Sequence, residues 1–304
     1  MSQPLPYLGP GMSPVKLYLR GEEATMAEIQ RDLEDAAAEA QRRINKLETK
    51  YGIGATVERA QLQLVKNELH KVQRELWLLV ARRMRAAPGR IGEAAALALE
   101  QIEQVLFRAI GQDVPDELVS AQRAYAEATV KTYLARGENG ISLSQRVYNT
   151  EKLSNGLVDR AINREILLGR NWQELAKVVR PMIDPNVKGG VSYAAKRLAR
   201  TELNNAFHTT SKALAAENPW VESQTWNLSR SHPELDQCDQ LARGHSKGLP
   251  PGQYAIGMVP SKPHPQCLCY LTENTVSEDE FFDILLATPV DQAVRGYRNA
   301  ARSA

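Results

Sequence analysis

All three cysteines of the chain lie in one C-terminal window that also contains a histidine. They are Cys238, Cys267 and Cys269, and His264 stands three residues before the second of them. Thiolate sulfur and imidazole nitrogen are ligands that zinc prefers, and four of them complete a tetrahedral structural site. The Cys-x-Cys pair suits an extended segment, on which alternate side chains share one face. These four side chains therefore predict one structural zinc.

Two other states of the same cysteines stay open from the sequence. Cys238 could form a disulfide with Cys267 or Cys269, or the three thiols could remain a reduced structural cluster. An odd number of cysteines leaves one unpaired in a monomer, which favours a reducing compartment during assembly. His232 and His245 are spare candidate ligands in the same window.

Catalytic fingerprints are weak throughout the sequence. His232-Pro-Glu234 matches the His-x-Glu of zinc deaminases, but that class also needs Pro-Cys-x-x-Cys at a helix start. Here Gln266 precedes the first cysteine of the pair, and a single residue separates the two cysteines. Nucleophile-elbow, phosphate-loop, HExxH and dinucleotide patterns are absent from the sequence. We therefore expect a protein that is not an enzyme.

Helical periodicity dominates the chain before the cysteine window. Apolar residues recur three and four positions apart over 22–50 and again over 62–79, and two glycines separate the stripes near 51–54. This pattern predicts two long helices in a hairpin, packed within one bundle or against a partner. Further helices are expected at 91–110, 117–135, 144–168, 171–181 and 192–217.

The pattern changes after residue 219. Residues 222–228 alternate around Trp226 as a strand would, and 268–272 is expected to pair with them. The elements together predict a mainly α protein with a small C-terminal α+β module, in which an elongated helical hairpin or bundle precedes a loop-rich, zinc-pinned β segment. The expected parts are an extended N-terminal arm (1–21), a helical hairpin or bundle domain (22–136), a C-terminal domain (141–275), and a helix with a fraying tail (276–304).

Composition excludes several classes of protein. The 304 residues carry a net charge of +2, which does not suit a strongly basic nucleic-acid coat. Aromatic residues make up 6%, which is low for an RNA binder that stacks bases. The most apolar stretch, 94–110, contains Glu100, Glu103 and Arg108, so no membrane span is expected. The first residues lack the features of a signal peptide, and we expect synthesis in the cytosol.

The C-terminal half resembles the phage head morphogenesis family, the Mu F-like minor head proteins. The resemblance rests on Arg200-Thr-Glu202 in a helix, then Trp226, Cys238 and the block Pro263-His-Pro-x-Cys-x-Cys269, and it covers roughly residues 140–272. The stretch from Ile141 to Leu175 is also similar to the family. Leu268 replaces the arginine usual between the two cysteines, and Leu241 replaces a further cysteine, so the five-ligand pattern is reduced to four. Under this resemblance, 141–275 is the head morphogenesis domain.

The resemblance implies a non-enzymatic minor head (capsid) protein of a tailed phage. Such a protein associates with the portal, contacts the major capsid or scaffolding protein, and assists head assembly, DNA packaging or ejection. It would lie in the virion, in the head interior or portal region, after assembly in the host cytoplasm, with phage DNA as a further partner. The alternative is a nucleic-acid-binding module with a zinc-knuckle-like C-terminal site. Salt-dependent DNA binding would distinguish the two.

Overall fold

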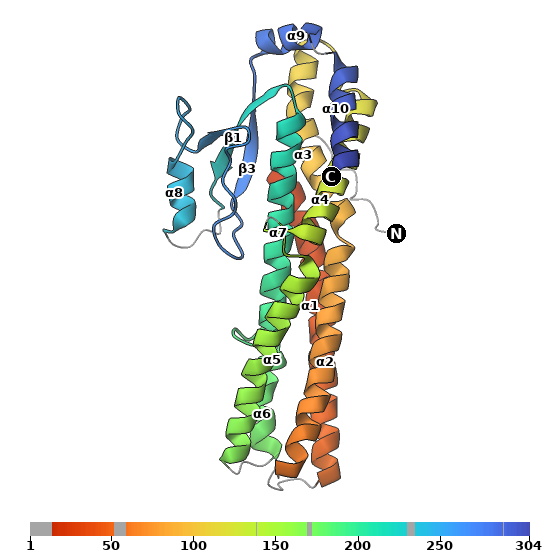
Figure 1. The fold of residues 1–304 in the computed structure, drawn as a ribbon, viewed down its shortest axis with the longest axis vertical. Helices are drawn as coiled ribbons and strands as arrows, with labels where there is room; N and C mark the ends of the chain where they lie inside the picture. The colour runs from red at the N-terminus through yellow and green to blue at the C-terminus, as the bar shows by residue number, and fades with distance from the viewer. Residues whose placement is uncertain (1–13, 52–58, 138, 169–171, 230–234, 288) are drawn as a thin grey trace. The chain divides into compact units, whose positions relative to one another are not determined.

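The structure is mainly helical, with one small sheet near the C-terminus (Figure 1). It is a computed structural model that describes residues 14–51, 59–137, 139–168, 172–229, 235–287 and 289–304. The expected fold class, mainly α with a small C-terminal α+β module, is confirmed. Among the described helices, none has both the length and the apolar character that a membrane crossing requires.

The chain folds into two compact units that are interleaved along the sequence. Unit 1 takes residues 1–23, 85–139 and 201–304, and unit 2 takes 24–84 and 140–200. The chain crosses from unit 1 to unit 2 between residues 139 and 140, within the stretch 136–141 where the expected parts of the chain meet. The contiguous parts expected on either side of it do not follow this division. Helical periodicity indicates that a face is buried, but it does not tell which other helix covers that face.

Unit 2 is a helical bundle. Its helices are α1 (Pro14–Tyr51) from residue 24 onward, α2 (Arg59–Arg85), α5 (Leu143–Leu167), α6 (Trp172–Ile183) and the first part of α7 (Val191–Glu217). The two predicted apolar stripes are buried where the structure describes them. Ile29 and Leu33 of α1 are 0% exposed, and Leu69 of α2 is 2% exposed. The two long helices of the hairpin are thus confirmed, and residues 52–58 between them lie outside the described part of the chain.

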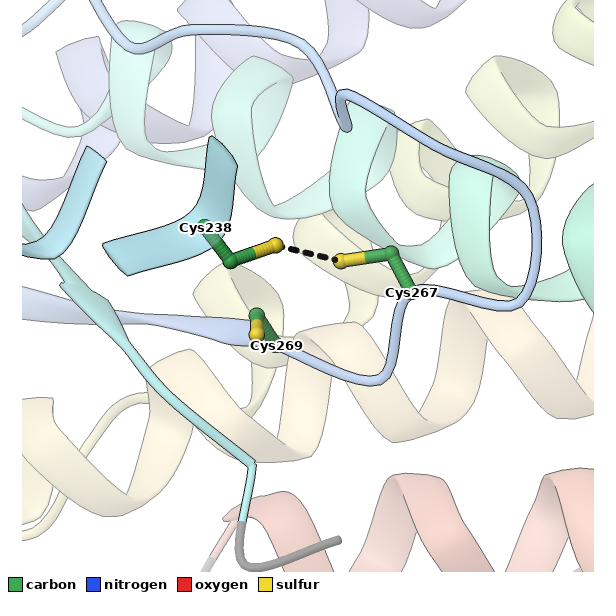
Figure 2. Close-up of side chains that lie close together, drawn as sticks. All are labelled: Cys238, Cys267 and Cys269. Carbon is green, nitrogen blue, oxygen red and sulfur yellow. Dashed lines mark hydrogen bonds between the residues drawn. The ribbon is translucent and has the colours of Figure 1, made fainter. Parts of the chain in front are cut away.

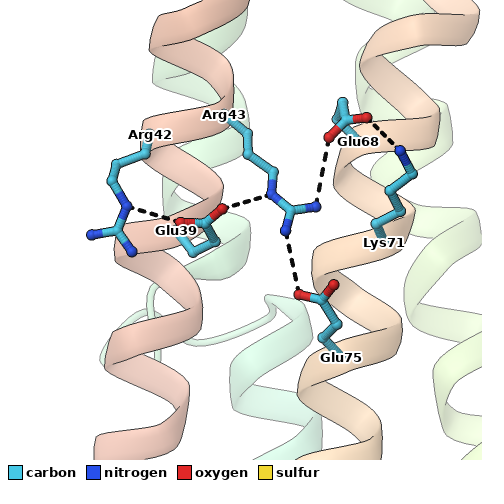
Figure 3. Close-up of polar contacts among 6 residues, drawn as sticks. All are labelled: Glu39, Arg42, Arg43, Glu68, Lys71 and Glu75. Carbon is cyan, nitrogen blue, oxygen red and sulfur yellow. Dashed lines mark hydrogen bonds and ion pairs between the residues drawn. The ribbon is translucent and has the colours of Figure 1, made fainter.

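Ion pairs fix the relative direction of α1 and α2. Arg83 near the end of α2 lies 2.7 Å from Asp32 in the first half of α1. Arg43, further along α1, lies 3.5 Å from both Glu68 and Glu75 of α2 (Figure 3). Residues later in α1 therefore contact residues earlier in α2, so the two helices run antiparallel. Because water still reaches these partly exposed side chains, burial of the apolar stripes contributes most of the stability.

Unit 1 contains the first described residues of the chain, 14–23 at the start of α1, and is built mainly on α3 (Pro88–Ala109) and α4 (Asp116–Arg136). Gly92 allows these two helices to approach closely, because a Cβ there would lie 2.8 Å from the backbone nitrogen of Glu127. Three aromatic side chains from distant parts of the chain form the centre of the core. Phe107 packs edge-on against Trp220 at 5.5 Å and against Phe281 at 5.2 Å between ring centroids. These contacts join α3 to the segments on either side of the sheet.

Both ends of the chain contain more helix than expected. The arm predicted as extended at 1–21 is helical from Pro14 onward, since proline fits the first turn of a helix, where its missing N–H has no partner to lose. The tail predicted to fray forms α10 (Val290–Ser303), which follows the expected short helix α9 (Glu278–Ala287). Tyr297 of α10 is fully buried and donates to the carbonyl of Leu214 at 3.1 Å. Its ring also lies 6.0 Å from that of Tyr125 between centroids, so the tail has a packed face.

The sheet has the antiparallel order β2-β1-β3. The central strand β1 (Val221–Asn227) is the predicted strand around Trp226, and β3 (Tyr270–Thr275) pairs with it as expected, with Trp226 opposite Leu271. The third strand, β2 (Gln253–Ala255), was not predicted, because three residues are too few to show alternation. This sheet and α8 (Gln237–Arg243) form the module that carries the cysteines.

Candidate metal centre

Cys238 is placed by the start of the short helix α8. Asp236 is the N-cap of this helix, and its Oδ1 accepts a hydrogen bond from the backbone N–H of Cys238 at 2.6 Å. The side chain of Asp239 returns a bond to the Asp236 backbone N–H at 2.9 Å, which completes a capping box. Two orphan N–H groups are satisfied in this way, so Cys238 has a fixed backbone position.

The loop that carries His264 is anchored along α7 at two points within unit 1. His208 donates from Nε2 to the carbonyl of Pro260 at 2.9 Å. Thr201, seven residues earlier on the helix, accepts at Oγ1 from the backbone N–H of Gln266 at 3.1 Å. Positions seven apart lie on the same face of a helix, so the loop between these anchors runs along one side of α7. Gln266 has a positive φ of 61°, which turns the chain into Cys267.

The three thiols meet in the core of the module (Figure 2). Cys238 comes from α8, and Cys267 and Cys269 come from the segment entering β3; they are 0%, 2% and 2% exposed. Their sulfur atoms all lie within 4.8 Å of one another. The Sγ atoms of Cys238 and Cys267 are 3.5 Å apart and the cysteines are free, so the structure holds thiols and not the disulfide that the sequence left open.

His264 joins this cluster through Cys238. Its Nε2 lies 3.2 Å from the Cys238 sulfur and 2.9 Å from Oδ2 of Asp236. Its Nδ1 faces the carbonyl of Pro265 at 3.0 Å, and a carbonyl can only accept, so Nδ1 carries a proton. Nε2 is the ring nitrogen that faces Cys238, and it would bind a metal there once its proton is released and its contact with the Asp236 carboxylate is given up. Asp236, Cys238 and His264 form a second group whose donor atoms lie within 4.8 Å of one another.

Burial and mutual contacts set the protonation of the three thiols. Desolvation raises the pKa of Cys238 to about 12. Hydrogen bonding between Cys267 and Cys269 lowers the pKa of Cys267 and raises that of Cys269, and the nearby charge of Lys262 also favours the Cys267 thiolate. Without a metal, Cys267 is therefore the first of the three thiols to lose its proton as the pH rises. A bound dication would reverse the cost of burial by stabilising all three thiolates.

The donor set fits a tetrahedral metal ion. Zn–S bonds of about 2.3 Å and Zn–N bonds of about 2.0 Å imply ligand–ligand separations of about 3.5–3.8 Å. The Cys238–Cys267 and Cys238–His264 distances of 3.5 and 3.2 Å lie at or slightly below this range. The cluster could hold a metal ion with Cys238 as the ligand shared by both donor groups. Four-coordination would require the His264 ring to move toward Cys267 and Cys269, because His264 shares a group of close donor atoms only with Cys238 and Asp236.

Cys238 thus meets both other cysteines and His264, whereas the spare candidate His245 belongs to neither group of donor atoms. His245 is exposed, and its Nδ1 lies 3.0 Å from the carbonyl of Ser246. His232 and Glu234, the residues of the deaminase-like pattern, lie outside the described residues. His208 is buried and edge-on to Trp226, and desolvation lowers its pKa to about 3.

Two residues of the site were missed by the sequence reasoning. Asp236 touches His264, and the Asp-x-x-Asp capping pattern ahead of α8 was a signal that could have located it. Lys262 donates from Nζ to the backbone carbonyl of Cys267 at 2.8 Å. Burial lowers the pKa of Lys262, while the thiols and the Glu22 carboxylate act in the opposite direction. Nothing local in the sequence indicates this contact, because it depends on how the loop folds back.

Comparison with known proteins gives no relative for this chain. No protein-family model matches it, and neither a curated protein nor a solved structure matches it. The resemblance of residues 140–272 to the head morphogenesis family therefore remains a prediction.

Proposed function

We propose that the chain is a non-enzymatic minor head protein of a tailed phage, associated with the portal, whose C-terminal module is stabilised by one structural zinc. The observation that carries the proposal is that Cys238 meets Cys267 and Cys269 in one group of donor atoms and His264 in another. These four residues are part of the pattern on which the family resemblance rests. A resemblance of sequence pattern gains support when the matching residues are distant in the chain but close in space. Cys238 contacts His264, 26 positions later, and Cys267, 29 positions later.

A structural role for the metal is supported by its surroundings. The three thiols belong to a core cluster with Trp226, Tyr254 and Leu271. A catalytic zinc keeps one coordination position open to substrate, whereas three cysteines and one histidine fill all four. In this proposal the ion joins α8 to the segment that enters β3, and the module supplies a rigid surface for the portal, with the major capsid or scaffolding protein as a further partner. Assembly would occur in the host cytoplasm and the protein would end in the virion head.

The metal part of the proposal is tested by elemental analysis of protein purified under reducing conditions. We expect about one zinc per chain. A His264→Ala variant should lose affinity for zinc, whereas His245→Ala should retain it, because His245 is exposed and bonded elsewhere. Purified protein that is free of metal and still has a well-ordered module would refute the zinc site.

The assembly part is tested by co-expression with the portal protein of the same phage, followed by pull-down and by mass spectrometry of purified virions. We expect a stable complex with the portal and a low copy number in the virion. Absence from virions and procapsids together with failure to bind the portal would contradict the proposal. Binding of DNA with a steep salt dependence by the isolated chain would move it to the nucleic-acid-binding class.

A further inference from the structure

Lys262 lies where a cation can act on the whole sulfur cluster. Its ammonium group donates to the backbone carbonyl of Cys267 at 2.8 Å, and its charge interacts with all three cysteines. Its side chain is half-buried, unlike that of Lys247, which stands exposed on a loop of the same module. A lysine that buries part of its length normally keeps its charged end in water. Here the charged end is instead turned to the residues that would hold a metal.

The position of Lys262 is fixed by the loop on which it stands. The anchors on α7, His208 to Pro260 and Thr201 to Gln266, lie two residues before it and four residues after it. The hydrogen bond to Cys267 closes a turn that ends one residue after the second anchor. The backbone on both sides of the lysine is therefore held, and its ammonium group is presented to the cluster as part of the folded loop.

Charge counting shows why a cation matters at this site. Three thiolates and a neutral imidazole around a divalent ion leave a net charge of −1. Asp236, whose Oδ2 lies 2.9 Å from His264, adds another negative charge at the edge of the site. A net negative charge in partly buried surroundings costs solvation free energy unless a cation compensates it. Residues just outside the ligands that supply such compensation commonly change metal affinity by about 10- to 100-fold.

We propose that Lys262 is a positioning residue of the metal centre: its charge compensates the anionic Cys3His complex, and its hydrogen bond fixes the backbone of Cys267. The inference rests on the proposed zinc site and goes beyond it by assigning a role to a residue that is not a ligand. Lys262 raises the affinity for the dication without touching it.

Three substitutions separate the two contributions of Lys262. Lys262→Met removes charge and hydrogen bond but keeps an apolar stem of similar length. Lys262→Gln keeps a donor for the Cys267 carbonyl but removes the charge, and Lys262→Arg keeps both. Lys247→Met is the matched control, because it removes one exposed lysine from the same module. Zinc affinity of the full chain is measured at constant pH by competition with a chromophoric chelator, and circular dichroism monitors folding.

We expect Lys262→Met and Lys262→Gln to weaken zinc binding by about 10- to 100-fold, with near-normal affinity in Lys262→Arg and Lys247→Met. Cobalt-loaded variants should keep the charge-transfer bands of thiolate ligation once saturated, because the ligands themselves are unchanged. Wild-type affinity in Lys262→Gln would overturn the role of the charge, and wild-type affinity in Lys262→Met would overturn the inference entirely. If the wild-type chain binds no zinc, the proposed site itself has failed, which is a different result from any pattern among the variants.

Discussion

Replacing Glu103 with glutamine should make unit 1 more stable at neutral and alkaline pH and remove a pH dependence of its stability. Glu103 is 1% exposed in the core of unit 1, and its Oε1 accepts from Gln122 Nε2 and from Asn218 Nδ2, each at 2.7 Å. Desolvation raises its pKa from 4.5 to about 8. The folded protein therefore holds a neutral carboxylic acid at pH 7, while the unfolded chain exposes a carboxylate.

The sign and size follow from proton linkage. A carboxyl whose pKa is raised on folding contributes its full stability below pH 4.5 and loses it as the pH rises toward 8. The free energy of unfolding should fall by about 1.4 kcal/mol per pH unit in this window, or roughly 3 kcal/mol between pH 5 and pH 7.5. Glutamine stays neutral and can accept the same two hydrogen bonds. Its new N–H group also has an acceptor nearby, since Oε1 of Gln122 is buried without a hydrogen-bond partner.

The assay is denaturant unfolding of the wild type and Glu103→Gln at several pH values between 5 and 8. The quantity of interest is the difference between the two free energies of unfolding, in which other titrating groups cancel. Glu273, whose pKa is raised to about 7 by burial, is one such group. Glu117→Gln removes an exposed carboxylate of α4 and serves as the control. A difference that stays constant across this range would refute the assignment of a neutral acid at Glu103.

Three further outcomes are expected. Leu69→Asp should destabilise the α1–α2 hairpin by a few kcal/mol, about 2–5, because it buries a charge at a side chain that is 2% exposed, whereas Leu78→Asp at 61% exposure should change the melting temperature little. Cys267→Ser should abolish stoichiometric zinc binding in elemental analysis and lower the melting temperature of the module, because a serine hydroxyl is a poor zinc ligand. Tyr297→Ala should cost about 3–5 kcal/mol in denaturant unfolding, since a fully buried ring and its bond to Leu214 are lost; an unchanged midpoint would show that α10 does not pack as described.

Periodicity and residue type were sufficient to predict several features. The apolar stripes through Leu33 and Leu69 are buried, and the strand around Trp226 pairs with the segment after Cys269. The four candidate ligands gather in one module, as their chemistry suggested. These features depend on a regular apolar repeat along one helix or strand, or on the common preference of cysteine and histidine for zinc. Both can be recognised from short stretches of sequence.

The missed features depend on contacts between distant segments. Lys262 reaches the cluster because Thr201 and His208 of α7 anchor its loop. Thr201 bonds Gln266, 65 residues later, and His208 bonds Pro260, 52 residues later. The packed face of α10 consists of Ala293, Val294 and Tyr297, a stripe too short and too interrupted by charge to stand out. The division into two units likewise follows from which helices meet, a property that no single helix carries.

The three-ring cluster of unit 1 sets an order on synthesis. Phe107, Trp220 and Phe281 enter the growing chain at widely separated times, and the packing face supplied by Tyr297 comes later still. Unit 2 has all its segments once residue 200 has been made. During translation, then, the α3–α4 pair must wait with an unfilled apolar face while the ribosome adds about 145 residues between Arg136, where α4 ends, and Phe281. Such a nascent chain would be exposed to chaperones for much of its synthesis.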